Sequence, residues 1–316
     1  DYQAAARPGR GLPLNERARA AVWELYEAFT ANSGERYSGL RCEALKLLTE
    51  DTQAVRYDYV VVDEAQDLSP VSLALMAEIC KSADGLFFAA DNKQSLYSRN
   101  YSWSSAHPRL QFRGRTAQLS RNYRSTREID RAAFSVLVAE EGDELVASNS
   151  VHEGPLPVLV RGVAADKQAE WVARFVRQMA RHLHLKASAA AVLVPDAAAG
   201  KTLASELQMQ GIEAQFFPGR DLDLKADVVR VLTLHAAKGL EFPIVVVAGL
   251  ESGHWSVPED FDEPDLFAER ARNERRVLYV GLTRAMRGLM LLVPQGCRHP
   301  AIVDLNLNHW HVECAL

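Results

Sequence analysis

Two adjacent carboxylates, Asp63 and Glu64, directly follow the apolar stretch 59–62. A carboxylate at the carboxyl end of a buried strand can hold Mg²⁺, directly or through water, and its neighbour can orient or deprotonate an attacking water. An ordinary acidic loop after a strand is the alternative interpretation. The pair therefore indicates metal-assisted phosphate chemistry only if other segments of the chain support it.

Four further segments supply polar and arginine side chains in a fixed order. They are residues 90–97, 119–126, 234–242 and 274–285. Together with residues 63–67 they resemble motifs II to VI of the superfamily 1 DNA helicases of the UvrD/Rep type. Five such motifs in the same order are not expected by chance. The resemblance implies an α/β fold of two RecA-like P-loop NTPase domains with mostly parallel sheets, the first domain being incomplete.

The same resemblance implies a site for ATP and Mg²⁺. Asp63 and Glu64 look like the magnesium-binding and water-activating pair of the Walker B motif. Gln94 is similar to the glutamine that senses the γ-phosphate, since an amide can donate to phosphate and accept from water. Arg124 and Arg284 match two arginines that in the family reach the γ-phosphate from across the inter-domain cleft, a role that suits a permanently charged guanidinium.

Further residues are assigned by the resemblance to the nucleotide and to DNA. Tyr123 looks like the ring that stacks on adenine, and Glu241 looks like the carboxylate that binds the ribose hydroxyls. Gly239 is also assigned to the nucleotide-binding residues. For single-stranded DNA the candidates are Tyr97, Trp103, Thr233 and His235. Base stacking suits Tyr97 and Trp103, although core packing is the alternative for Trp103 and a structural role is the alternative for His235.

One segment nearly spells the phosphate-binding loop that an ATP site needs. Residues 192–202 run from an apolar stretch through Gly200-Lys201-Thr202, but Pro195 replaces the first glycine of GxxxxGK[ST]. Proline has no N–H for the phosphate and cannot take the positive φ of that glycine. The segment also lies between motifs IV and V. We therefore predict an ordinary strand and helix here.

The residues before Asp63 contain no Gly-Lys-Ser or Gly-Lys-Thr. We expect the Walker A loop to lie on a missing amino-terminal segment, in keeping with a chain that starts at Asp1 and not at Met. Without that loop this chain alone is predicted not to hydrolyse ATP. Only about ten residues join the strand predicted at 214–217 to motif V, so the large 2B accessory domain of longer relatives is not expected.

Apolar periodicity predicts the elements that must position these residues. Helices are expected at 14–30, 40–48 and 71–80, with Ser69 as the cap and Pro70 in the first turn of the third. The β-branched run 57–62 predicts a parallel strand buried on both faces. Further strands are expected at 86–90, 117–119, 156–160, 190–194, 214–217, 228–234, 244–248 and 289–293. The domain boundary is placed at residue 108, giving a partial first domain (1A, after its 1B insertion) at 1–108 and a second domain (2A) at 109–316.

Composition sets the remaining expectations. With 316 residues and 48% hydrophobic residues, two domains can each bury a core. No apolar run is long enough to cross a membrane, and four scattered cysteines favour a reducing, cytoplasmic setting without a zinc site. The net charge of −5 restricts nucleic-acid contacts to local clusters, such as the six arginines and no acids of residues 109–127.

Two hypotheses remain open from the sequence. In the first, the chain is part of a monomeric ATP-dependent helicase or translocase that moves 3′ to 5′ on single-stranded or junction DNA. In the second, it is an ATPase-inactive homologue that binds nucleic acid or acts as a scaffold. The presence of Asp63, Glu64, Gln94, Arg124 and Arg284 favours the first, because an inactive protein has no evident need for all five.

Overall fold

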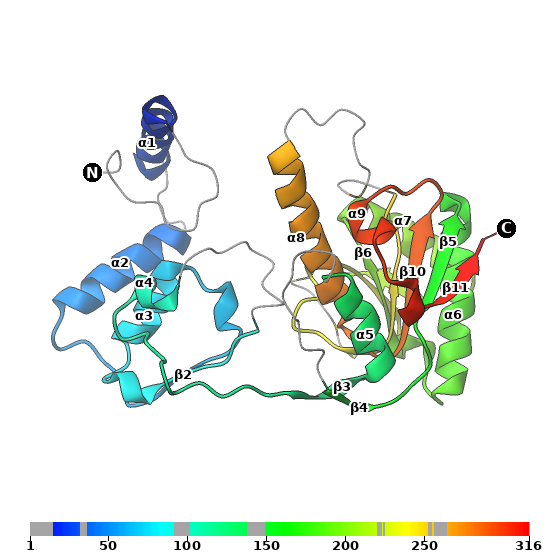
Figure 1. Ribbon diagram of the computed structural model, residues 1–316, viewed down its shortest axis with the longest axis horizontal. Coiled ribbons are helices and arrows are strands. Elements are labelled where there is room, and N and C mark those ends of the chain that lie inside the picture. Colours follow the sequence, from blue (N-terminus) through cyan, green and yellow to red (C-terminus); the bar gives the residue numbers. More distant parts are fainter. Residues whose placement is uncertain are drawn as a thin grey trace. The chain divides into compact units, whose positions relative to one another are not determined.

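The computed structural model describes residues 15–31, 37–91, 102–137, 149–219, 223, 225–251, 255 and 264–315 (Figure 1). The chain forms two compact units, Asp1–Gln118 and Leu119–Leu316. The first unit extends beyond the boundary predicted at residue 108, because Leu110 is buried in its core and Phe112 packs against the same core. Among the described residues, no helix is long and apolar enough to cross a membrane.

The first unit combines helices with a short parallel sheet. Its helices are α1 (Glu16–Ala31), α2 (Tyr37–Glu50), α3 (Pro70–Glu78) and α4 (Trp103–Ala106), and β1 (Val60–Val62) pairs with β2 (Leu86–Phe88). Ser69 caps α3 by accepting from the Ser72 amide at 3.2 Å, and Pro70 begins the helix, as predicted. Val60, Val62 and Leu86 face a core completed by Leu73 and Ala77 of α3.

One face of the two-stranded sheet is exposed, which contradicts the prediction of a strand buried on both faces. Val61 is 72% exposed, Tyr59 80% and Phe87 64%, whereas Val60, Val62 and Leu86 are buried. Side chains alternate between the two faces of a strand, and α3 packs on only one of them. The β-branched run is therefore a strand as predicted, but a one-sided one.

The second unit contains a seven-stranded sheet in which every neighbouring pair is parallel. The order is β11-β5-β10-β9-β6-β8-β7. The strands are β5 (Val158–Val163), β6 (Ala190–Val194), β7 (Ala214–Phe216), β8 (Val229–Thr233), β9 (Phe242–Val247), β10 (Ala285–Pro294) and β11 (His311–Cys314). The predicted α/β fold with mostly parallel sheets is confirmed.

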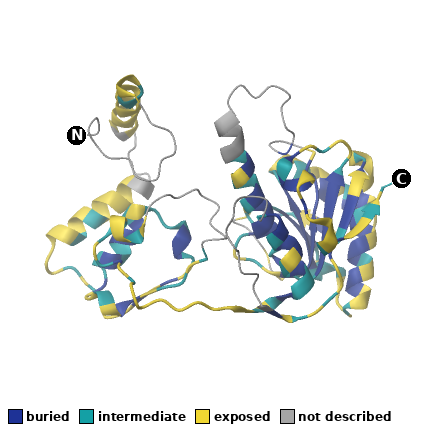
Figure 2. Ribbon diagram, in the orientation of Figure 1, coloured by how far each residue is buried: buried dark blue, intermediate teal, exposed yellow. Residues whose placement is uncertain are grey.

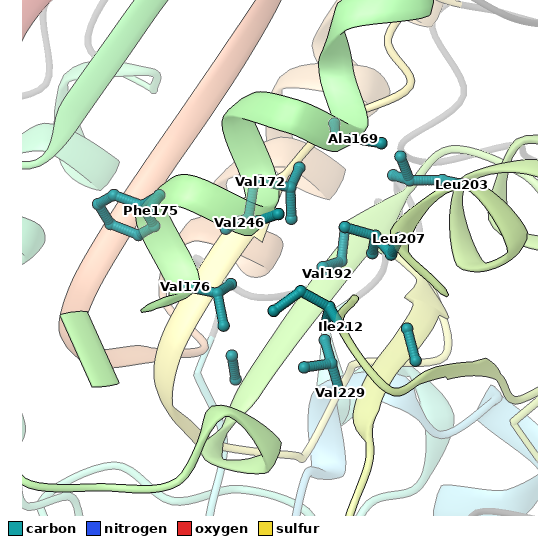
Figure 3. Packing of buried hydrophobic residues seen from close by; sticks show 14 of the residues in the cluster. Ala169, Val172, Phe175, Val176, Val192, Leu203, Leu207, Ile212, Val229 and Val246 are labelled. Carbon is teal, nitrogen blue, oxygen red and sulfur yellow. The ribbon is translucent and has the colours of Figure 1, made fainter. Parts of the chain in front are cut away.

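Helices cover both faces of this sheet. α6 (Gln168–His182) and α7 (Ala197–Met209) pack on one face, while α5 (Arg127–Ser135) and α8 (Pro264–Leu282) contact β9 or β10 from the other; α9 (Pro300–Val303) contacts α8. Val172 and Val176 of α6 and Leu203 and Leu207 of α7 meet strand residues such as Val192 (Figure 3). The strands are accordingly the most buried part of the unit (Figure 2).

A second small sheet precedes the large one along the chain. β3 (Arg121–Thr126) pairs in parallel with β4 (Asn149–His152). The strand predicted at 117–119 was wrong, because residues 113–120 are exposed and without regular structure. The actual strand begins at Arg121 and contains the motif IV residues themselves. Neither β4 nor β11 was expected from the apolar pattern.

Candidate functional site

The acidic pair lies in a tight turn immediately after β1. Val62 ends the strand, and a 3₁₀ turn over Ala65–Asp67 follows. The Asp63 side chain is exposed, and its Oδ1 accepts a hydrogen bond from the Glu64 amide at 2.9 Å. Glu64 has left-handed backbone angles, φ 50° and ψ 38°. A side chain other than glycine is uncommon there, and such strain is often found at functional sites.

Gln66, which the sequence did not single out, fixes the acidic turn. Its side chain is buried; Nε2 donates to Glu64 Oε2, and Oε1 accepts from the Asp91 amide at 3.0 Å. The Ala65 amide also donates to the Ala89 carbonyl at 2.9 Å. The turn after β1 is thus hydrogen-bonded to the segment after β2, where motif III begins. Gln94 and Tyr97 lie outside the described residues.

Trp103 lies in an aromatic cluster of the first unit. Its ring centroid is 5.5 Å from that of Phe88 and 5.6 Å from that of Phe112, the second contact being edge-to-face. Both partners pack against the core of the unit. This half-buried arrangement agrees with the alternative that Trp103 packs in the core. Stacking of Trp103 on a DNA base stays a prediction.

In the second unit, motifs IV and V meet through an ion pair. Arg124 Nη2 lies 2.6 Å from Glu241 Oε1, and the two side chains are 39% and 38% exposed. Asn122, another residue that the sequence did not single out, shapes the motif IV turn: its Oδ1 accepts from the amides of Arg124 and Ser125 at 2.8 and 3.3 Å. The Asn122 side chain therefore orders the backbone that presents Arg124.

Motif VI joins this arrangement from the neighbouring strand. Ala285 of β10 is the register partner of Phe242 of β9, and the Arg284 carbonyl accepts from the Phe242 amide at 3.0 Å. Arg287 Nη1 donates to the Arg124 carbonyl at 2.8 Å. Glu241 and Arg284 each precede the first residue of a strand, so motifs IV, V and VI converge at the amino ends of β9 and β10.

The Arg284 side chain is buried, with 1% of its surface exposed. Nε donates to the Val280 carbonyl at 2.9 Å and Nη2 to Thr283 Oγ1 at 3.1 Å, and Nη1 lies 3.4 Å from the Leu240 carbonyl. These bonds connect the end of α8 to the motif V segment. Arg284 therefore has a packing role in this structure, apart from any contact with a ligand.

The remaining candidates of the second unit differ in their exposure. The Tyr123 ring is 62% exposed. Thr233 ends β8 and accepts from the Ala236 amide at 3.1 Å through Oγ1, which shapes the start of the motif V segment. His235 and Gly239 are exposed in that segment, and Gly239 has φ +78°, a conformation that favours glycine.

The segment resembling a phosphate loop is an ordinary strand and helix, as predicted. Asp196 caps α7 by accepting from the Ala199 amide at 2.9 Å, and Gly200, Lys201 and Thr202 lie within the helix. Gly200 packs so closely on β7 that an added Cβ would lie 2.5 Å from Phe216 Cδ2. The glycine is therefore explained by helix-to-sheet packing.

Comparison with known proteins gives two family matches on this chain. Residues 6–112 match the family described as UvrD/REP helicase N-terminal domain, and residues 219–295 match the UvrD-like helicase C-terminal domain. The first range contains Asp63 and Glu64; the second contains Thr233, Glu241 and Arg284. Arg124 lies in neither.

Individual relatives agree with these matches. DNA helicase II of Escherichia coli K12 is 46% identical over 69 residues, 22% of this chain and 9% of that protein. A probable DNA helicase of Mycoplasma pneumoniae is 27% identical over 300 residues, 88% of this chain and 52% of that protein. The chain thus spans about half the length of the Mycoplasma relative and a much smaller share of the other.

Among solved structures, the C-terminal domain of a possible DNA helicase from Lactobacillus plantarum covers 60% of this chain and 98% of that chain, with a TM-score of 0.44 and 22% identity. The two family matches follow each other in the order N-terminal domain, C-terminal domain, and the motifs described above fall within or between them. The chain belongs to the UvrD-like DNA helicase family.

Proposed function

We propose that this chain is part of an ATP-dependent DNA helicase or translocase that moves 3′ to 5′. In this proposal Asp63 and Glu64 of the first unit act in ATP hydrolysis, and so do Arg124 and Arg284 of the second unit. The observation that carries the proposal is the convergence of Arg124, Glu241 and Arg284 at the amino ends of β9 and β10. Three segments far apart in the sequence meet there: the Arg124 guanidinium pairs with the Glu241 carboxylate, and the Arg284 backbone is hydrogen-bonded to Phe242, the residue after Glu241.

The acidic turn fits a magnesium ion that is shared with a nucleotide. No cluster of three or more metal-ligating side chains occurs in the part of the chain that the structure describes. Mg²⁺ in phosphate-transfer sites is held by one or two carboxylates, with phosphate oxygens and water as the other ligands. Asp63, whose carboxylate is exposed, would hold the ion, which supplies charge neutralisation on the phosphates. Glu64, held by Gln66, would orient the attacking water.

The Arg124–Glu241 ion pair leaves Arg124 available for a phosphate. Both side chains are more than a third exposed, and exposed pairs typically contribute about 0.2 to 1 kcal/mol. Arg124 can therefore exchange its partner at little cost, which would free Glu241 for the ribose hydroxyls beside an adenine on Tyr123. An arginine placed on the γ-phosphate is typically worth ~10³ to 10⁵ in rate.

The other assignments follow the family pattern. Gln94 would sense the γ-phosphate, and Gly239 would allow close approach of the nucleotide. Tyr97, Trp103, Thr233 and His235 would contact single-stranded DNA. Twelve residues, 217–228, connect β7 to β8, and this short connection supports the proposal that no 2B domain is inserted between these strands.

We further propose that the chain on its own does not hydrolyse ATP at a helicase rate, since no GxxxxGK[ST] occurs in it. DNA-stimulated phosphate release by the purified chain, lost in Asp63→Ala, would contradict this statement. The reading frame upstream of Asp1 provides a second test. A Walker A sequence there supports the helicase, whereas a start codon near Asp1 supports the inactive homologue.

Activity of the full-length parent tests the main proposal. We expect it to unwind a duplex with a 3′ single-stranded tail and not one with a 5′ tail. Glu64→Gln should lower DNA-stimulated ATP hydrolysis by about 10² to 10⁴, the usual contribution of a general base, while DNA binding persists. Arg161→Ala, which changes an exposed arginine on β5, is the control. A parent whose ATP hydrolysis is unchanged by Glu64→Gln and by Arg124→Ala would refute the proposed site.

A further inference from the structure

A pocket in the second unit is lined by none of the residues assigned above to ATP or DNA. Its volume is about 420 Å³, and it lies between α6 and the strands β5, β10 and β11. The walls are mostly apolar and include Leu156, Trp171, Phe175 and Met179. Pockets of about 300 to 1,000 Å³ with apolar walls and a few polar groups are typical small-molecule sites.

Two charges at this pocket neutralise each other. The Arg174 guanidinium lies 3.7 Å from the centroid of the Trp171 ring, and its Nη2 is 3.3 Å from Glu313 Oε2. Arg174 is 59% exposed and Glu313 37%. This pair therefore places a neutral, polar rim on the apolar pocket.

Arg287 gives the pocket a second cation. It is half-buried, and Nη1 donates to the carbonyls of Arg124 and Met286 at 2.8 and 2.9 Å. A guanidinium also carries N–H donors on Nε and Nη2. Among the described residues no carboxylate pairs with Arg287, so these donors and the positive charge remain for a ligand. Placing an unpaired charge beside apolar walls costs free energy unless an anion compensates it.

We propose that this pocket binds a small amphipathic anion, with its apolar body against Leu156, Phe175 and Met179 and a single oxyanion on Arg287. Phe175 and Met179 are buried at 8% and 9% exposure, so the apolar wall is deep. One unpaired cation in a bounded pocket matches one carboxylate or phosphate group. It provides no row of subsites for an extended peptide.

A ligand in this pocket would change the hydrogen bonding of motif IV. Arg287 lines the pocket and also donates through Nη1 to the Arg124 carbonyl, so one side chain contacts both the pocket and motif IV. An oxyanion that draws the guanidinium changes the hydrogen bond to Arg124. Occupation of the pocket therefore alters the turn at residues 122–125, which Asn122 orders.

The experiment titrates the full chain with 3-(2-naphthyl)propionate while ¹H–¹⁵N spectra are recorded. The uncharged match is 3-(2-naphthyl)propanol, and 2-(2-naphthyl)ethyl phosphate distinguishes phosphate from carboxylate. We expect the acid to shift the Trp171 indole signal and to bind at least about tenfold more tightly than the alcohol, as a charge-assisted hydrogen bond implies. The amides of residues 122–125 should shift as well.

Variants separate the anion contact from the apolar contact. Arg287→Ala should lose about tenfold in affinity for the acid and none for the alcohol. Leu156→Trp, which keeps Arg287 and fills the mouth of the pocket, should weaken both probes, and Arg161→Ala should weaken neither. Equal binding of acid and alcohol overturns the proposal, as does wild-type affinity in both Arg287→Ala and Leu156→Trp. Binding of an acidic aromatic peptide in the absence of binding by the small anions also overturns it, in favour of a protein partner.

Discussion

At the residue scale, Gln66 connects the acidic turn to the segment after β2, and its removal should loosen both. Gln66→Ala leaves the Asp91 amide without its side-chain acceptor. Losing a buried hydrogen bond typically costs about 1 to 2 kcal/mol, so hydrogen exchange at the Asp91 amide should accelerate roughly five- to thirtyfold. Gln53→Ala, on an exposed side chain of the same unit, is the control. Unchanged exchange at Asp91 would mean that Gln66 does not hold this contact in solution.

Arg284 should matter for stability as well as for any ligand. Arg284→Ala removes donors to the Val280 carbonyl and Thr283 Oγ1 and empties a buried volume. We expect a loss of about 2 to 4 kcal/mol in the unfolding free energy of the second unit. Urea denaturation followed by circular dichroism measures it, with exposed Arg298→Ala as the matched control. A loss no larger than that of the control would leave the buried guanidinium without a structural role.

The residues that carry the candidate chemistry could be predicted because their types and order are specific to motifs. Gln66 and Asn122 could not be. The Asp91 amide that Gln66 accepts from is 25 residues further along the chain, and the role of Asn122 depends on a turn that no periodicity describes. Arg284 was predicted as a ligand-facing side chain. Its burial follows from the packing of α8 on the sheet, which the sequence does not display.

At the element scale, α7 depends on a glycine for its fit to β7. Alanine favours helices by about 1 kcal/mol over glycine, but at Gly200 the added Cβ would lie 2.5 Å from Phe216 Cδ2. We therefore expect Gly200→Ala to destabilise the second unit by about 1 to 3 kcal/mol, the usual cost of overpacking. The melting temperature should fall, and Phe216→Leu in the same chain should restore part of it. A rise in melting temperature would show that Phe216 moves aside freely.

Most helices and the central strands were predictable at this scale. The five residues of β6 are all buried, as expected for a continuous apolar run in a parallel sheet. β11 was not predictable, because its sequence His-Val-Glu-Cys has only four residues and none of them is buried. β3 was placed too early, since its strand residues Arg121–Thr126 are mostly polar. Whether a short edge strand forms depends more on the strands and side chains that it packs against than on its own residue types.

At the scale of the whole molecule, the exposed link between the units should be the preferred site of cleavage. Residues 113–120 are all exposed and without helix or strand, and they contain Arg113 and Arg115. Brief trypsin digestion should separate the chain there, because exposed irregular segments are nicked first. Mass spectrometry identifies the cut, and the variant Arg113→Ala with Arg115→Ala should lack it. Identical digestion of the variant and the parent chain would place the accessible link elsewhere.

The uncovered face of the β1–β2 sheet has a practical consequence for measuring stability. Tyr59, Val61 and Phe87 present apolar surface to water in the folded first unit. Environment-sensitive dyes such as anilinonaphthalene sulfonate respond to exposed apolar surface, so they should fluoresce with the native chain at room temperature. In a dye-based melting curve the fluorescence would then be high before unfolding begins, and it would change little when the chain unfolds. Val61→Thr together with Phe87→Thr should lower that initial signal, and circular dichroism gives the melting temperature without this interference.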